Sequence, residues 1–260
     1  MVGGGNLIDE VGDINFITRG TKVFGSVHVG NEICDFRPDW AGNEMVAKCK
    51  SESEYPPEDE PEDLEEDELK RSRLLATNPA QDPLNLGVGQ FLRGSSPAHR
   101  GLVGDDGSVI DVMVVWTKRA ECMTSDLDGD CSLTATTKNN MRGLIDLAVT
   151  ETNMAYDLSG VATQLRLVHA YRDETYVEAS SNEFDAALEA IKSTTDGIMD
   201  DDHDKRKTYG ANMVAMIIDG SSFCGKALIV DPPGCDSMFS VTKWSCATGY
   251  FTFGHEIAKP

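Results

Sequence analysis

The residues with the clearest chemical potential stand in the run His255-Glu256-Ile257-Ala258-Lys259. In an H-E-x-x-H helix, two His side chains one turn apart hold a zinc ion, and the Glu between them acts as a general base. The first His and the Glu are present here, and Lys259 stands in the place of the second His. Because a protonated Lys cannot ligate zinc, the run indicates a hydrolytic metal site with an incomplete ligand set.

The elements that must position this pair are indicated by hydrophobic patterns in the second half of the chain. Continuous apolar runs are typical of strands buried on both faces, and alternation favours a half-exposed strand. Apolar residues at helical spacing indicate two helices, the second preceded by a possible capping box of Ser180 and Glu183. We expect strands at 109–116, 161–167, 211–218 and 239–244, and helices at 139–158, at 184–199 and from Cys246 onward to His255.

The order of these elements predicts the fold class. Strands that alternate with helices give a layered α/β unit with a mostly parallel sheet. Residues 12–50 differ, because short β-branched runs between turns at Gly20 and Gly30 predict a small β-rich domain. We therefore expect a β-rich region at 1–50, an acidic linker containing Pro, Gly and Asn at 51–106, and the α/β unit at 107–260.

The charge of the chain is strongly acidic and unevenly distributed. There are 44 acidic and 23 basic residues, for a net charge of −21, and residues 52–68 alone carry eleven acidic side chains. This balance argues against a nucleic-acid partner, because little on the chain would neutralise phosphates. No run of about 18 apolar residues exists, so we expect no transmembrane helix. No signal peptide is visible at the N-terminus, Met1-Val2-Gly3-Gly4-Gly5.

Basic residues follow the acidic stretch in the run Lys70-Arg71-Ser72-Arg73. A paired-basic segment exposed in a flexible linker is where a processing protease would cut. The alternative is that these residues only balance the acidic stretch and end a short helix. The sequence leaves both interpretations open.

The cysteines favour disulfide bonds over a structural metal site. None of the seven shows the C-x-x-C spacing of a zinc knuckle. Scattered cysteines are typical of proteins of the secretory pathway, with one left over here. Cys34 and Cys49 could bridge neighbouring strands, and Cys122 and Cys131 could close a loop. The full set is Cys34, Cys49, Cys122, Cys131, Cys224, Cys235 and Cys246.

Taken together, a series of segments resembles the reprolysin-like (adamalysin-type) metzincin zinc metallopeptidases. The matches come in the family's order and span about residues 107–258, and their combination is specific although no single one is. Residues 15–50 are similar, less closely, to the family's β-rich propeptide. The matching segments are 111–117, 145–156, 159–161, 165–168, 210–214, 223–227, 239–241 and 253–257.

The resemblance implies a secreted zinc endopeptidase that is made as a zymogen and acts on proteins or peptides. It implies a metzincin-like N-terminal subdomain, with a mixed, mostly parallel sheet, two long helices and the active-site helix. His255 would be the first zinc ligand and Glu256 the general base. The family's pattern is H-E-x-x-H-x-x-G-x-x-H followed by a Met-turn. This chain shows neither the second and third His nor the Gly and the Met-turn.

The departure at Lys259 leads us to expect a truncated, inactive copy of such a protease. The alternative is a secreted, non-catalytic binding protein or pseudoenzyme. A third interpretation, a cytosolic calcium-binding acidic protein, rests on the acidic segments and predicts reduced thiols. The run 126–130 has alternating carboxylates, but it fails as an EF-hand loop because Cys131 and Thr137 stand where Gly and Glu are required.

In the light of the resemblance, Cys224 and Cys246 bracket the segment before the active-site helix and could be bridged. Cys122 would pair with Cys131, and Cys34 with Cys49, so that Cys235 is left over. An alternative for Cys34 is a thiolate that caps zinc in the zymogen. Peptide specificity and oligomeric state do not follow from the sequence.

Overall fold

The computed structural model describes residues 2–6, 12–39, 41–58, 109–127, 131–179, 181–228 and 238–259. These residues belong to one compact unit, which is formed by 1–59 together with 107–260. Two features singled out in the sequence lie outside the described residues: Cys235, and the basic run with Lys70, Arg71 and Arg73. None of the described helices is both long and apolar enough to cross a membrane.

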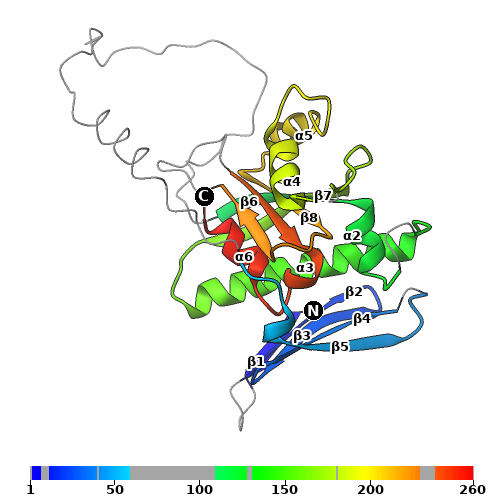
Figure 1. The fold of residues 1–260 in the computed structure, drawn as a ribbon. Coiled ribbons are helices and arrows are strands. Elements are labelled where there is room, and N and C mark those ends of the chain that lie inside the picture. The colour runs from blue at the N-terminus through cyan, green and yellow to red at the C-terminus, as the bar shows by residue number, and fades with distance from the viewer. Residues whose placement is uncertain are drawn as a thin grey trace, which may run out of the picture. The chain divides into compact units, whose positions relative to one another are not determined.

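The N-terminal residues form a five-stranded antiparallel meander, called here the N-terminal sheet (Figure 1). Gly20 and Gly30 have positive φ angles, +63° and +58°, at two of its turns. Cys34 and Cys49 lie opposite each other in neighbouring strands and form a disulfide. The elements are β1 (Val2–Asn6), β2 (Gly12–Arg19), β3 (Lys22–Val29), β4 (Glu32–Pro38) and β5 (Met45–Ser51), followed by the 3-10 helix η1 (Glu52–Glu54).

The second half of the chain forms a mixed sheet in the order β7-β6-β8-β10-β9. The first four strands run parallel, and only β9 pairs antiparallel, with β10. This confirms the predicted α/β class with a mostly parallel sheet. The strands are β6 (Val109–Trp116), β7 (Gln164–Arg172), β8 (Met213–Ile218), β9 (Gly225–Ala227) and β10 (Phe239–Lys243).

Alternate residues of the central strands divide the apolar core into two layers. Val112 and Val114 of β6 pack with one set of helices, whereas Met113 and Val115 pack with Phe184 and its neighbours on the other face. Such division requires apolar residues at every position of the strand, as the continuous run indicates. The helices are α2 (Lys118–Met123), α3 (Ala135–Leu158), α4 (Glu183–Lys192), α5 (Asp202–Tyr209), the 3-10 helix η2 (Trp244–Cys246) and α6 (Thr252–Ile257).

The prediction of a single helix over 184–199 was wrong in its bounds. The helix expected over 184–199 ends at Lys192, and a separate helix α5 follows. The N-cap of α4 is Asn182, at φ +52° and without a side-chain cap bond, so Glu183 is the first residue of the helix and not the third, as a capping box with Ser180 would require. Ser180 itself lies outside the described residues. The carboxylate of Glu183 instead accepts hydrogen bonds from Ser221 and Ser222. Two long helices were expected, but among the described helices only α3, with 24 residues, is long, and α4 has 10.

The N-terminal sheet packs against α3 through β2 and β3 (Figure 1). A Cβ atom at Gly143 would lie 2.2 Å from the ring of Phe24, so this close approach requires glycine. Glu151 of α3 is buried at the same contact, where it accepts hydrogen bonds from the hydroxyl of Ser26 and, at 2.8 Å, from the backbone N–H of Gly249. One carboxylate therefore joins the N-terminal sheet to the turn before α6.

Two acidic groups at this contact have raised pKa values. Burial is the main cause for Glu151, whose pKa rises to about 8; the bonds from Ser26 and Gly249 lower it and the nearby Asp35 raises it. Burial also raises the pKa of Asp35 to about 6, against the lowering effects of Arg37, Thr248 and Lys50. Each therefore binds its proton more tightly in the folded protein than in the unfolded chain.

We expect the free energy of unfolding to fall as pH rises, because a raised pKa contributes stability only while the group stays protonated. The contribution of Glu151 is complete below its ordinary value of 4.5 and is lost as pH rises through about 8. Each pH unit in this window costs about 1.4 kcal/mol. Glu151→Gln should remove that slope in urea denaturation measured from pH 5 to pH 9. The exposed substitution Glu44→Gln is the control, and equal slopes for Glu151→Gln and the parent protein would refute this assignment.

Candidate metal site

The helix that carries the His-Glu pair is short and held closely on one side by α3. The hydroxyl of Tyr156 donates to the carbonyl of Gly254 at 3.1 Å. A Cβ atom at Gly254 would lie 2.7 Å from the hydroxyl oxygen of Thr152, so no larger residue fits there. Phe253 and Ile257 join the apolar core. This packing fixes the rotation of α6 about its own axis.

That rotation gives the two predicted site residues opposite environments. His255 is exposed, whereas Glu256 is fully buried. Glu256 lies against β9, where a Cβ atom at Gly225 would come within 2.4 Å of its Cγ. Its Oε1 accepts a hydrogen bond from the Nζ of Lys259 at 2.8 Å, and its Oε2 has no hydrogen-bond partner among the described residues. Burial raises the pKa of Glu256 to about 7, an effect that Lys259 opposes and Glu58 adds to.

A third residue reaches this site from a distant part of the sequence. Glu58 follows the N-terminal sheet, and its Oε1 accepts a hydrogen bond from the hydroxyl of Thr252 at 2.6 Å. Its Oε2 is buried without a partner among the described residues. One ligand atom each from Glu58, His255 and Glu256 lie within 4.8 Å of one another. The sequence analysis missed Glu58, because it placed this residue in an acidic linker where nothing distinguishes one carboxylate from the next.

The donor set fits a divalent cation. Two carboxylates this close repel each other unless a proton or a cation lies between them. Buried polar atoms normally have partners, yet one oxygen of Glu58 and one of Glu256 have none in the described structure. Imidazole nitrogen and carboxylate oxygen are both zinc ligands. Lys259 neutralises one oxygen of Glu256 and leaves the other for such an ion.

A disulfide and a pair of stacked rings connect this site to the N-terminal sheet. Cys224 and Cys246 are bonded to each other and pack with Ile33 of β4 in one buried cluster. Tyr55 and Tyr250 stack in the same cluster, with ring centroids 4.6 Å apart. The segment that precedes Glu58 is therefore held against the turn that precedes α6.

The other candidate ligands of the sequence analysis do not join this site. Cys34 is disulfide-bonded to Cys49, so it is not a free thiolate and its alternative role as a zinc cap was wrong. Cys122 is bonded to Cys131 and closes its own loop. Asp126 of the acidic turn accepts bonds from Arg37 and Lys48, whereas residues 128–130 are outside the described structure.

A second acidic group lies at the start of α5, where Asp173, Asp201 and Asp202 come together. The Nζ of Lys205 contacts Asp201 at 2.6 Å and Asp202 at 3.2 Å. This ammonium group already supplies a counter-charge to the carboxylates. Oδ1 of Asp202 accepts hydrogen bonds from Tyr171 and Lys205, whereas its Oδ2 is buried without a partner among the described residues.

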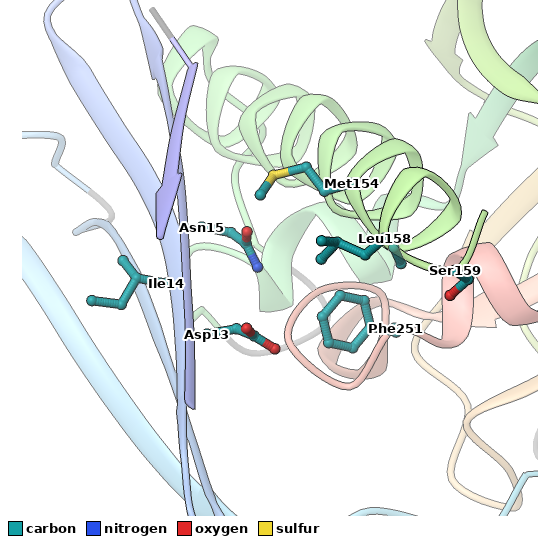
Figure 2. Close-up of a pocket in the computed structure, with 8 residues that line it drawn as sticks. Asp13, Ile14, Asn15, Met154, Leu158, Ser159 and Phe251 are labelled. Atoms are coloured by element: carbon teal, nitrogen blue, oxygen red, sulfur yellow. The ribbon is translucent and has the colours of Figure 1, made fainter. Parts of the chain in front are cut away.

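A cavity of about 260 Å³ lies between β2, the C-terminal end of α3 and Phe251. Figure 2 shows Phe251 between Asp13 of β2 and the end of α3, where Leu158 and Ser159 lie. Phe251 has a φ of +62° and immediately precedes α6. The residues that line this cavity include neither His255 nor Glu256, so it is separate from the metal-ligand cluster.

Comparison with known proteins gives relatives but no family match. No family model matches the chain. The chain is 39% identical over 118 residues to a protein of Xanthomonas campestris pv. campestris named peptidyl-Asp metalloendopeptidase, covering 45% of this chain and 27% of that protein. It is 30% identical over 250 residues to proteins of the same name from two strains of Stenotrophomonas maltophilia, covering 96% of this chain and 51% of each. The chain thus spans about half the length of these two curated relatives.

Likeness to solved structures is low. The chain is similar to metalloproteinase-II from Bacteroides fragilis with a TM-score of 0.37 and 12% identity, over 98% of this chain and 72% of that one. It is similar to a chaperone-substrate complex with a TM-score of 0.42 and 16% identity, over 59% of this chain and 24% of that one. At these scores neither likeness carries an argument about function.

The close approach of β9 to α6 is open to a direct test. In Gly225→Ala the new Cβ atom would meet the buried side chains of Glu256 and Thr252 at 2.4 and 2.6 Å. Overpacking of this kind costs about 1–3 kcal/mol of the free energy of unfolding, which urea denaturation would measure. Ala227→Ser, two residues along β9, is the control and should change it by less. An unchanged stability in Gly225→Ala would show that α6 and β9 do not pack as described.

Proposed function

We propose that this chain belongs to a zinc-dependent metalloendopeptidase of the metzincin type, which hydrolyses peptide bonds at aspartyl residues of proteins. The similarity to peptidyl-Asp metalloendopeptidases over 96% of the chain carries this proposal. The pairing of an exposed His255 with a buried Glu256 on α6 supports it, because the motif requires both side chains on one helix beside the sheet.

The roles of the residues follow from their positions. Bound zinc would polarise the substrate carbonyl and make a water molecule acidic enough to react near neutral pH. His255 would hold the ion through its exposed ring. Glu256 would take a proton from the attacking water at a carboxylate oxygen and pass it to the leaving amine. The packing of Gly225 and Thr252 around Glu256 restricts its side chain and keeps bulk water away from it.

The N-terminal sheet is proposed to be the propeptide of a secreted zymogen. Three disulfides, one of them within the sheet, support an oxidising compartment. Cleavage near Lys70, Arg71 and Arg73 would separate the sheet from the mixed-sheet part of the chain. The same residues are then both a boundary between domains and a processing site.

A non-catalytic role is favoured by one observation. Lys259 stands at the fifth position of the motif, and its ammonium group contacts Glu256 at 2.8 Å with little exposure. A chain that keeps Lys at this position has one His ligand within the motif and should bind protein partners without hydrolysing them. Determining the reading frame past the codon for Ala258 distinguishes the two: His at the fifth position and a further His six residues on would support the protease.

The enzymatic proposal predicts a specific loss in Glu256→Gln. In the full-length protein, this substitution should lower kcat for cleavage of an Asp-containing peptide by about 10²–10⁴-fold, because it removes the proton acceptor. Zinc content, measured by atomic emission on both proteins, allows the two rates to be compared per bound ion. Glu189→Gln, on the exposed side of α4, is the matched control. Peptide cleavage by Glu256→Gln at the parent rate would exclude the proposed mechanism.

A further inference from the structure

We propose that Glu58 is itself a ligand of the metal in this chain. This inference rests on the proposed metal site and adds a residue to it. The ligand comes from the segment after the N-terminal sheet, outside the H-E-x-x-H run.

The carboxylate of Glu58 is oriented rather than free. Its Oε1 accepts a hydrogen bond from Thr252, the first residue of α6, at 2.6 Å. Its Oε2 is left buried and unpartnered among the described residues, as is Oε2 of the fully buried Glu256. A nitrogen of His255 lies within 4.8 Å of the ligand oxygens of both. Two unpartnered oxygens beside an imidazole form the donor set that a divalent cation would satisfy.

The backbone that precedes Glu58 is anchored to the mixed-sheet part. The N–H of Cys224 donates to the carbonyl of Pro57 at 2.9 Å, immediately before Glu58. Tyr55 is buried and stacks on Tyr250 with an interplanar angle of 3°. Pro56 and Pro57 further restrict the backbone. The position of Glu58 is therefore fixed by these specific contacts and not by a nonspecific electrostatic attraction between the acidic segment and the site.

The other acidic residues described in this segment behave differently. Glu52 pairs with His28 at the surface at 2.9 Å, and Glu54 is exposed. Only Glu58 of these three is turned toward a second carboxylate. Bringing it next to Glu256 costs electrostatic free energy, which a bound cation would reverse in sign. The alternative is a single proton shared by the two carboxylates, without a metal.

The test is a zinc titration of the purified 260-residue chain by calorimetry, together with the absorption spectrum of its cobalt(II) form. Glu58→Gln keeps the size of the side chain and removes its negative charge. It should weaken zinc affinity by at least about 10–100-fold, the loss that removing an outer-shell partner already causes, and change the cobalt spectrum. Glu54→Gln, four residues earlier, is the matched control and should leave both unchanged. Glu58→Asp should give an intermediate zinc affinity. This variant still tests the proposal if Glu58→Gln folds poorly.

The outcomes separate this inference from the proposed function. His255→Ala should lose zinc binding at this site, and binding equal to the parent would overturn the metal site itself. If His255→Ala loses zinc while Glu58→Gln binds as tightly as the parent with the same cobalt spectrum, the metal site stands and the role of Glu58 is refuted. A chain in which no variant or parent binds zinc would favour the shared proton and refute both.

Discussion

The site depends on how closely the short helix α6 can approach its neighbours on two sides. Gly254 allows Thr152 of α3 to lie against the helix, and Gly225 of β9 leaves room for the side chain of Glu256. A methyl group at either glycine would collide with these partners. Together the two contacts set which residues of α6 face inward. The rotation of α6 about its axis therefore determines three features. His255 is exposed, Glu256 is buried, and Glu58 contacts Thr252.

The N-terminal sheet is coupled to this helix through buried carboxylates. Glu151 joins Ser26 of the sheet to the N–H of Gly249, and Asp35 accepts a bond from Thr248 at 3.3 Å. Both carboxylates accept hydrogen bonds from the turn that precedes α6. Burial of a carboxyl group is costly unless it is hydrogen-bonded or protonated, so this contact is favourable in a limited pH range. If the sheet dissociated, the turn would lose these hydrogen bonds. The carboxylate of Glu58 would leave the site in the same event.

Much of the fold could be predicted because it depends on local patterns. The continuous apolar run at 109–116 identified β6, because a strand that is buried on both faces has apolar residues at nearly every position. Helix α3 was found by its apolar spacing, although it begins at Ala135, where Thr134 and Thr137 form the capping box. The failed capping prediction at α4 has a local cause as well: the helix starts after Asn182 in a left-handed conformation, which a capping pattern does not reveal.

The site was only half predictable. His255 and Glu256 are neighbours in sequence, and their residue types alone indicate metal chemistry. Glu58 lies about two hundred positions away, within a stretch where eleven residues are acidic. Its role follows from the anchoring of Pro57 on Cys224 and from the hydroxyl of Thr252, and both are contacts made by the tertiary fold.

The measurement that tests this account most directly is a crystal structure of the zinc-loaded chain with anomalous data collected at the zinc edge. The account predicts an anomalous peak at α6, at about 2.0–2.2 Å from a ring nitrogen of His255 and from a carboxylate oxygen of Glu58. A peak at this place without Glu58 as a ligand would contradict the role of Glu58. Zinc bound only elsewhere on the chain, with His255 free, would contradict the metal site and the function built on it.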